Sequence, residues 1–462
     1  MVDGYNRGVS EAIFSVSGLR GIAGRGLTAE LVSRVTEVFC RLYGPGGFAL
    51  GRDPRPSGSW IKDVVQKVLS EFRCQVFELG ICPTPTAVHF VRQRGLKGGL
   101  VITASHNPIE WNGLKLVHPA GRFLFADEVA ALDRLMAEGS ADSLYCCAGS
   151  EGGVVSEAGA VDAHIAAIRR HPLFAGISAG GLRIGVDAVN GAMSGAAAAL
   201  LRAFGAEPVT INCEPEKLSR GFPRGPEPVP GNLTALCQLV QAERLDAGFA
   251  FDPDGDRFSC VDENGVPLGE EATLGLAALF VLAQRKTDVV VNLSTSRMVD
   301  SIAERFGVRV LRTPVGEANV VRKMLETGAV LGGEGNGGVI FPEINSTRDG
   351  LVAAAAVLGL MRKSGKSLGA IRQELPEYHQ VKSAVQAREF DVERLISNLE
   401  RYRGKVPIVD RSDGIRIDGG DWWVHIRKSN TEPAVRIIAE ARSRMLAEDL
   451  VGQVRQLLEK GG

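Results

Sequence analysis

The sequence predicts an α/β protein in which three similar α/β domains, with mixed and largely parallel sheets covered by helices, precede a C-terminal α+β domain. Three observations lead to this fold class. Apolar strand patterns alternate with helix patterns, this order occurs three times, and a polar loop follows each repeat. After about residue 375 the alternation stops, and the pattern becomes that of adjacent antiparallel strands.

The three repeats share one order of elements, which is strand, helix, strand, helix, strand. In the first repeat these segments are residues 46–50, 59–72, 75–80, 86–95 and 98–104. In the second repeat they are residues 182–188, 194–205, 208–212, 232–245 and 247–251. In the third repeat they are residues 288–294, 298–307, 308–313, 317–328 and 329–333. Because strands that alternate with helices form largely parallel sheets, each repeat predicts one α/β domain.

A polar loop follows the last strand of each repeat. The three loops are SHNP at 105–108, DPDGDR at 252–257 and EGNGG at 334–338. In sheets of this kind, ligands bind where loops leave the carboxyl ends of the strands. We therefore expect all three loops to contribute to ligand binding.

The last part of the chain has a different pattern. A helix is expected over 391–404, and strand patterns follow within 414–430 and 434–442, with DGG at 418–420 as a hairpin turn. These features predict the α+β domain. The segment around 140–160, rich in Gly, Ser and Ala, is the expected first linker. The resulting domain ranges are 1–152, 153–256, 257–372 and 373–462.

The composition favours a small-molecule ligand. The 462 residues include 53 Lys and Arg against 54 Asp and Glu, so the net charge of -1 gives no positive field for nucleic acid or an acidic membrane. The longest apolar runs, at 274–283 and 351–361, are shorter than the roughly 20 residues of a membrane span and predict buried helices. The sequence is compatible with either a monomer or a dimer.

The cysteines and the N-terminus predict a cytoplasmic protein. The eight cysteines contain no C-x-x-C pair and lack the dense spacing of a secreted disulfide scaffold, so we expect them to be reduced. The first residues, MVDGYNRGVSEAIF, lack the basic start and apolar core of a signal peptide.

The loop at 252–257 is a candidate metal site. Asp252, Asp254 and Asp256 alternate along an extended segment, so their carboxylates face one side. At about 4 Å and an effective dielectric constant of 20, each close pair costs about 4 kcal/mol, which a bound Mg²⁺ or Ca²⁺ would remove. An EF-hand is excluded because Arg257 replaces its glycine and a strand precedes the loop. A solvated acidic turn is the remaining alternative.

Two further loops present polar side chains. GEGNGG matches the dinucleotide fingerprint G-x-G-x-x-G, but that fingerprint must open a helix and here a strand pattern follows. The loop instead presents Glu334 and Asn336 to hydroxyls of a polyol, or is a simple hairpin turn. The segment RKSNTEP offers a guanidinium, two hydroxyls and an amide that suit a phosphate, or is an ordinary polar hairpin. Its candidate residues are Arg427, Ser429, Asn430 and Thr431.

Ser105 is either a reacting group or a helix cap. Its surroundings, ASHNP, are not a G-x-S-x-G nucleophile elbow, so acyl hydrolysis is not expected. Lys115 and Arg20 are candidate cations for phosphate transfer, and surface charges are the alternative for both.

Taken together, TASHNP, DPDGDR, GEGNGG and RKSNTEP, in this order and spacing, resemble the α-D-phosphohexomutase superfamily of phosphoglucomutases, phosphomannomutases and phosphoglucosamine mutases. The resemblance covers essentially the whole chain. It implies four domains around a central cleft, with one loop from each. It also implies an intramolecular phosphotransferase that interconverts hexose 1-phosphate and hexose 6-phosphate, with glucose, mannose and glucosamine all open as the sugar.

The resemblance implies roles for individual residues. Ser105 is similar to the serine that carries the phosphoryl group, and together with the three aspartates of DPDGDR it would hold Mg²⁺. Arg257 would lie close to the phosphate, and Glu334 would contact sugar hydroxyls. The RKSNTEP residues would hold the phosphate that is not reacting. A hexose 1,6-bisphosphate would be both the intermediate and the priming activator.

The chain departs from the superfamily in its sugar loop, which usually reads G-E-x-S-G-H. Here Asn336 stands at the serine position and Gly338 at the histidine position. The candidates for proton transfer are therefore Lys115, Arg20 and His106. Two alternatives to a mutase stay open, which are a metal-dependent sugar phosphatase that uses the same serine and a non-catalytic sensor of sugar phosphates.

Overall fold

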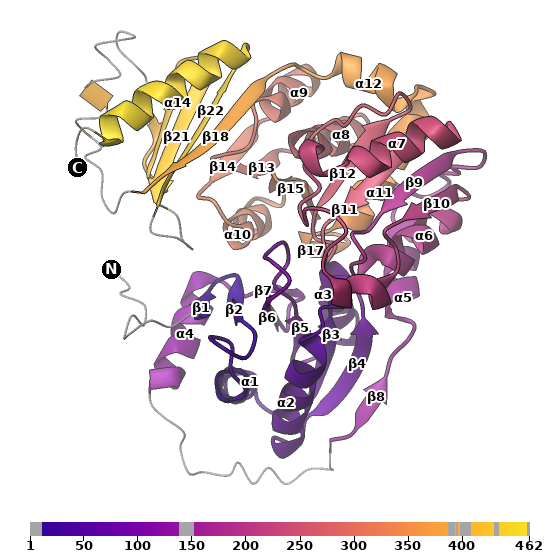
Figure 1. The fold of residues 1–462 in the computed structure, drawn as a ribbon, viewed down its shortest axis with the longest axis vertical. Helices are drawn as coiled ribbons and strands as arrows, with labels where there is room; N and C mark the ends of the chain where they lie inside the picture. Colours follow the sequence, from indigo (N-terminus) through magenta and orange to yellow (C-terminus); the bar gives the residue numbers. More distant parts are fainter. Residues whose placement is uncertain are drawn as a thin grey trace.

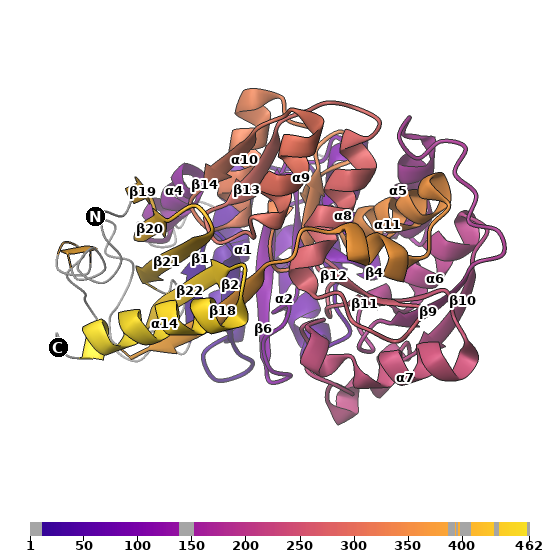
Figure 2. The same ribbon diagram turned by 90° about the horizontal axis from the view of Figure 1, so that it is seen from above.

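The computed structural model describes residues 12–137, 152–386, 393, 396–397, 408–428 and 434–459. Figure 1 shows four units arranged in an arc, with the second and fourth units at opposite sides, and Figure 2 shows the same separation from above. Among the described residues the strands form sheets of 13, four and five strands. The predicted class, three α/β domains and a C-terminal α+β domain, is confirmed.

The first unit has a mixed sheet covered by helices. Its strands are β1 (Ala12–Ser15), β2 (Gly18–Ile22), β3 (Gly47–Arg52), β4 (Gln75–Ile81), β5 (Gly98–Ile102), β6 (Trp111–His118), β7 (Arg122–Phe123) and β8 (Val154–Ser156). Its helices are α1 (Ala29–Tyr43), α2 (Gly58–Glu71), α3 (Thr84–Arg94) and α4 (Ala126–Ala137). The strands β3, β4, β5 and β8 run parallel, whereas β6 pairs antiparallel with β5 and β2.

The second unit has a four-stranded sheet in the order β10-β9-β11-β12. Its strands are β9 (Arg183–Asp187), β10 (Glu207–Ile211), β11 (Ala247–Phe251) and β12 (Phe258–Asp262). Its helices are α5 (Ala160–Arg170), α6 (Met193–Ala203) and α7 (Thr234–Glu243), with short 3-10 turns η1 (Pro215–Arg220) and η2 (Pro230–Asn232). Only the pairing of β11 with β12 is antiparallel within this sheet, because a tight loop connects these two strands.

The third unit repeats the same plan. Its strands are β13 (Val289–Asn292), β14 (Val310–Thr313), β15 (Leu331–Glu334), β16 (Gly338–Phe341) and β17 (Asn345–Arg348). Its helices are α8 (Glu270–Leu282), α9 (Met298–Phe306), α10 (Glu317–Thr327), α11 (Gly350–Ser364) and α12 (Leu368–Glu374). The two apolar runs predicted as buried helices form α8 and α11, which pack together in a core shared with the second unit. Among the described residues, no helix is both long and apolar enough to cross a lipid bilayer.

The fourth unit is antiparallel throughout its described strands, as predicted. These are β18 (His379–Val385), β19 (Ile408–Asp410), β20 (Ile415–Asp418), β21 (Trp422–Lys428) and β22 (Val435–Ala441), followed by α14 (Arg444–Glu459). The hairpin turn predicted at 418–420 connects β20 to β21, and Gly420 adopts a positive φ of 90° that favours glycine. The predicted helix over 391–404 lies almost wholly outside the described residues.

Two short strands bear on where the units divide. β8 pairs with β4 of the first sheet, and β12 pairs with β11 of the second. We therefore draw the first unit to Ser156 and the second to Asp262, a few residues beyond the sequence-based ranges. The first and third sheets are joined through Ser346 of β17 and Arg122 of β7, which makes one continuous 13-stranded sheet.

A buried histidine pair lies where the first three units meet. The rings of His89 on α3 and His164 on α5 stack with centroids 4.7 Å apart, and Nε2 of His164 lies 2.9 Å from Oδ2 of Asp349. The His89 Nδ1 contacts the carbonyl oxygen of Ile344 at 3.3 Å. Burial, followed by the neighbouring His164, lowers the pKa of His89 from 6.5 to about 4.

We predict that His89 makes the protein less stable in mild acid. Its folded pKa lies below its unfolded value, so its contribution is present above about pH 6.5 and is lost as the pH falls toward 4. Between pH 7.5 and pH 5 this loss is about 2 kcal/mol. Urea denaturation of His89→Asn at both pH values should show a smaller drop than the wild-type protein. The more exposed His379→Asn is the control and should show the same drop as the wild-type protein. A drop in His89→Asn as large as that of the control would contradict the prediction.

Candidate active site

Two of the predicted loops meet at the carboxyl ends of their strands. Ser105 follows β5 and Asp252 follows β11, and the Ser105 Oγ donates a hydrogen bond of 3.0 Å to Asp252 Oδ2 across 147 positions of sequence. Both side chains are buried. Ser105 has a φ of 50°, in the left-handed region that costs a non-glycine residue about 1–2 kcal/mol. The loop therefore holds this hydroxyl in a strained and defined position.

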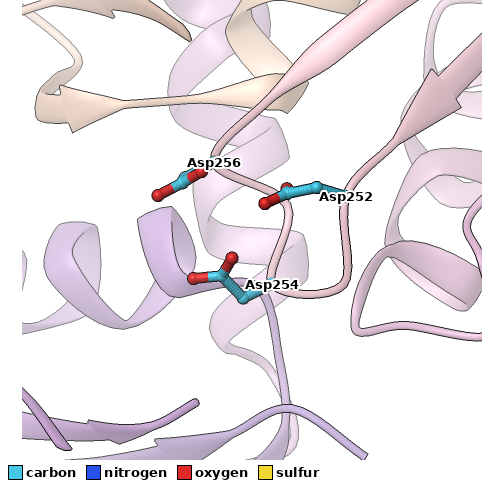
Figure 3. A group of neighbouring side chains, drawn as sticks. All are labelled: Asp252, Asp254 and Asp256. Carbon is cyan, nitrogen blue, oxygen red and sulfur yellow. The ribbon is translucent and has the colours of Figure 1, made fainter. Parts of the chain in front are cut away.

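The three aspartates form the predicted acidic cluster. They come from one loop and turn their carboxylates to the same side of it (Figure 3), with one oxygen of each within 4.8 Å of the others. All three are fully buried. The Oδ1 atoms of Asp254 and Asp256 have no hydrogen-bond donor among the described residues. Buried carboxylate oxygens without donors are the ligands that Mg²⁺ and Ca²⁺ take in proteins, so this donor set fits such a cation.

The carboxylates of the acidic loop differ in the direction of their pKa shifts. Burial, followed by the charges of Asp256 and Asp254, raises the pKa of Asp252 well above its usual range. Burial also acts to raise the pKa of Asp256, but Arg348 and Lys115 outweigh it and hold this pKa well below the usual range. The cations around the loop thus compensate two carboxylates, and Asp252 lacks full compensation.

Lys115, predicted as a cation near the phosphate, is bound to the acidic loop. Its Nζ donates to Asp254 Oδ2 at 2.6 Å and to Asp256 Oδ2 at 2.9 Å. The Thr84 hydroxyl donates to the same Asp254 oxygen at 2.6 Å. Burial acts to lower the pKa of Lys115, but Asp254 and Asp256 outweigh it and raise this pKa. Lys115 therefore remains an ammonium that neutralises the loop.

His106, Arg20 and Arg257 lie around the serine. The His106 Nδ1 is 3.5 Å from the Ser105 Oγ, and burial, followed by nearby Arg257 and Arg20, lowers the pKa of His106 to about 2. The Arg20 Nη1 donates to Asn107 Oδ1 at 3.0 Å. The backbone N–H of Arg257 donates to Asp252 Oδ1 at 3.1 Å. The structure thus places these three predicted residues together around Ser105.

Arg55 holds the serine loop, and the sequence analysis missed it. The Arg55 guanidinium is fully buried, and its Nε donates to Asp53 Oδ2 at 3.1 Å. Its other four donors reach backbone carbonyls of the serine loop, which belong to Ser105, Asn107, Pro108 and Trp111 at 2.6–3.0 Å. All five N–H groups of the guanidinium are therefore satisfied. The motif GRDPR, at the carboxyl end of β3, was the available signal.

The predicted sugar loop is a hairpin between β15 and β16, and the strand after it agrees with the rejection of a dinucleotide fingerprint. Glu334 is buried and accepts hydrogen bonds from Asn292 Nδ2 at 2.8 Å, from the Gly316 N–H at 3.1 Å and from Arg348 Nη1 at 2.9 Å. The sequence analysis did not identify these three partners. The Asn336 Oδ1 is buried and has no hydrogen-bond partner within the described part of the chain.

The fourth loop is described only in part. Arg427 lies near the end of β21, with its Nε 4.0 Å from Asp413 Oδ2, and that oxygen accepts from the Val315 N–H at 3.0 Å. Asp413 thereby connects the fourth unit to the third. The other predicted phosphate-binding residues, Ser429, Asn430 and Thr431, lie outside the described residues.

A cavity of about 450 Å³ lies beside the serine loop. Its walls are four residues of the first unit and four of the second, which are His106, Pro108, Ile109, Glu110, Phe222, Pro226, Glu227 and Asn232. This volume lies within the range of about 300–1,000 Å³ that is typical of small-molecule sites. His106 and Glu227 line it, with His106 Nε2 3.7 Å from Glu227 Oε1.

Family models match all four units. Residues 11–142, 162–265 and 270–378 match the alpha/beta/alpha domains I, II and III of phosphoglucomutase/phosphomannomutase. Residues 380–457 match the C-terminal domain of the same family.

Relatives match along nearly the whole chain. A phosphoglucomutase/phosphomannomutase of Thermococcus kodakarensis is 34% identical over 97% of this chain and 98% of its own length. A probable phosphoglucosamine mutase of Methanopyrus kandleri is 33% identical over 97% and 98%. The crystal structure of a putative phosphomannomutase from Thermus thermophilus has a TM-score of 0.81 at 26% identity and covers 97% of this chain and 99% of that one.

We predict that the acidic loop binds Mg²⁺. A divalent cation relieves the repulsion among three buried carboxylates, so millimolar MgCl₂ should raise the melting temperature by about 3 °C or more, and EDTA should reverse the rise. Asp254→Asn should abolish this shift. Asp63→Asn, on the exposed face of α2, is the control and should keep it. A shift of equal size in both variants would place the cation elsewhere.

We predict that Arg55→Lys destabilises the protein strongly. A lysine has three donors where the guanidinium has five, so buried acceptors lose their partners. We expect the free energy of unfolding to fall by about 3 kcal/mol. The neighbouring Arg52→Lys, which loses one bond to the Asp53 carbonyl, should cost below about 1 kcal/mol. Equal urea midpoints for the two variants would show that Arg55 does not hold the loop.

Proposed function

The chain belongs to the phosphoglucomutase/phosphomannomutase family of isomerases, and we propose that it interconverts hexose 1-phosphate and hexose 6-phosphate by carrying a phosphoryl group on Ser105. One observation carries this proposal. The strained Ser105 hydroxyl contacts Asp252 of the acidic loop, although the two residues come from different units of the fold. A phosphoryl acceptor and a cation-binding loop thus lie in contact.

The reaction has two symmetric halves. In the first, the bond between phosphorus and the Ser105 oxygen breaks while a bond forms to the free hydroxyl of a hexose monophosphate. The proton of that hydroxyl ends on the serine oxygen, and the product is a hexose 1,6-bisphosphate. In the second half, the other phosphate of this bisphosphate returns to Ser105, which leaves the isomeric monophosphate. A small amount of hexose 1,6-bisphosphate primes the serine of unphosphorylated protein.

Phosphoryl transfer requires positioning and charge compensation more than covalent assistance from the protein. Asp252, Asp254 and Asp256, together with a Ser105 oxygen, would hold Mg²⁺, which supplies positive charge for the phosphoryl oxygens. Lys115 keeps two of these carboxylates ionised and in place. Arg257 and Arg20 supply further positive charge beside Ser105.

Substrate contacts come from the third and fourth units in this proposal. Glu334 and Asn336 contact sugar hydroxyls, and the acceptor oxygens of Glu334 are already oriented by three protein donors. Arg427, with Ser429, Asn430 and Thr431, holds the phosphate that is not reacting. The substrate class is the phosphates of glucose, mannose or glucosamine. No partner beyond these small molecules is required.

We predict that Ser105→Ala loses mutase turnover by a factor of about 10³ or more, because it removes the hydroxyl that would carry the phosphoryl group beside Asp252. The measurement is phosphorus NMR of glucose, mannose and glucosamine 1-phosphates with Mg²⁺ and priming hexose 1,6-bisphosphate. Ser219→Ala, an exposed serine on η1, is the control and should retain wild-type turnover.

The same spectra separate the alternatives. Release of inorganic phosphate in place of the isomeric ester would indicate a sugar phosphatase. Binding of the sugar phosphates without any turnover, even after priming, would indicate a sensor. Wild-type turnover by Ser105→Ala would overturn the assignment of Ser105 as the phosphoryl carrier. Comparable rates on two sugars would define a broad enzyme, and one dominant sugar would define a narrow one.

A further inference from the structure

Arg348, at the end of β17, connects the acidic loop to the sugar loop. Its Nη2 donates to Asp256 Oδ2 at 2.7 Å, and its Nη1 donates to Glu334 Oε2 at 2.9 Å. The third nitrogen, Nε, lies 3.2 Å from Glu317 Oε2. The side chain is buried. One guanidinium thus contacts three carboxylates that belong to two units of the fold.

Gly338 makes room for this arginine. A Cβ atom at position 338 would lie 2.2 Å from the Cδ and 2.7 Å from the Cγ of Arg348, both closer than atoms can approach. The aliphatic part of Arg348 therefore occupies the space that any side chain at 338 would need. This position is the one where the sugar loop lacks the usual histidine, so the glycine and the arginine form a matched pair.

The ion pairs of Arg348 determine the orientation of two carboxylates with separate tasks. A planar guanidinium can hold two carboxylates in fixed directions at once, whereas an ammonium is a point charge without such directionality. Asp256 shares its Oδ2 between Arg348 and Lys115, which leaves its Oδ1 without a hydrogen-bond donor among the described residues, 3.9 Å from the Arg257 Nε. Glu334 accepts Arg348 on Oε2 and two other donors on Oε1. Without Arg348, Glu334 Oε2 would lose its protein donor and Asp256 Oδ2 would keep Lys115 alone.

We propose that Arg348 is a positioning residue that couples sugar recognition to the metal loop, by fixing Glu334 toward the sugar and Asp256 toward the cation. The inference rests on the proposed function for its sugar-binding half. In this proposal the Arg348 side chain occupies the space that a histidine at position 338 would need. Arg348 stays charged, acts through Asp256 and Glu334, and does not itself exchange a proton with the substrate.

A double-mutant cycle tests the proposal with Arg348→Ala, Gly338→Ala and the combined variant. We expect each single variant to lower kcat/KM for the preferred hexose 1-phosphate by about 100-fold, largely through KM, because Gly338→Ala displaces the arginine. The combined variant should be no worse than Arg348→Ala alone within about threefold. If the losses in kcat/KM of the two single variants multiply in the combined variant, the proposed pairing of Gly338 with Arg348 is wrong. Wild-type kcat/KM in Gly338→Ala would overturn it as well.

A second readout needs no turnover. Mn²⁺ binding, followed by electron paramagnetic resonance without substrate, should weaken about tenfold in Arg348→Ala and in Gly338→Ala, which lies within the range for partners that orient metal ligands. Unchanged Mn²⁺ affinity in both variants would overturn the coupling. If the wild-type protein isomerises no hexose phosphate, the proposed function fails, while this readout still tests the contact of Arg348 with Asp256.

A conservative variant separates loss of the proposed role from loss of folding. Arg348→Lys keeps the charge and most of the stem, so we expect a melting temperature close to that of the wild-type protein. Its single ammonium cannot direct both carboxylates, so KM should still rise by about tenfold. A purely structural role predicts the opposite pattern, in which KM is unchanged wherever the protein folds, and that result would overturn the proposal.

Discussion

Three buried carboxylates in one tight loop are the constraint on which the rest of the structure depends. At about 4 Å, each unrelieved pair costs about 4 kcal/mol at an effective dielectric constant of 20. The chain meets this cost by bringing Lys115 from the first unit and Arg348 from the third unit to Asp256 of the second. The acidic loop therefore offers carboxylates to a cation and also holds the first and third units against the second through these ion pairs.

The serine loop shows how one buried hydroxyl is held in place outside the helices and strands. Ser105 has a left-handed backbone, and carbonyl groups of the following segment, up to Trp111 at the start of β6, face the Arg55 side chain. Arg55 satisfies four of them with one planar group, while Asp53 and the Thr103 hydroxyl, 2.6 Å apart, complete the support. A buried charge thus serves the geometry of one hydroxyl.

The sequence was sufficient for the order of elements, the four units, the acidic cluster and the position of Ser105, because hydrophobic periodicity and short polar motifs are local signals. It did not identify Arg348, since a single arginine has no pattern until the fold shows which carboxylates surround it. The motif GRDPR was a signal for Arg55, but only the fold shows that its guanidinium binds carbonyls of the serine loop. The sequence-based limits of the first two units stay a prediction, and the two sheets extend a few residues beyond them. β8 and β12 are short, and only their pairing shows which sheet they join.

The pairing of β7 with β17 determines how the candidate site residues are connected to one another. Backbone hydrogen bonding runs from the strands behind Ser105 to the strands behind Glu334, so these two groups stand in one frame. The fourth unit has its own sheet, and it meets that frame through side chains such as His425, whose Nδ1 lies 2.8 Å from the Ser294 Oγ. The position of Ser105 relative to Glu334 is therefore set by backbone pairing, whereas the position of Arg427 relative to both depends on side-chain contacts between the third and fourth units.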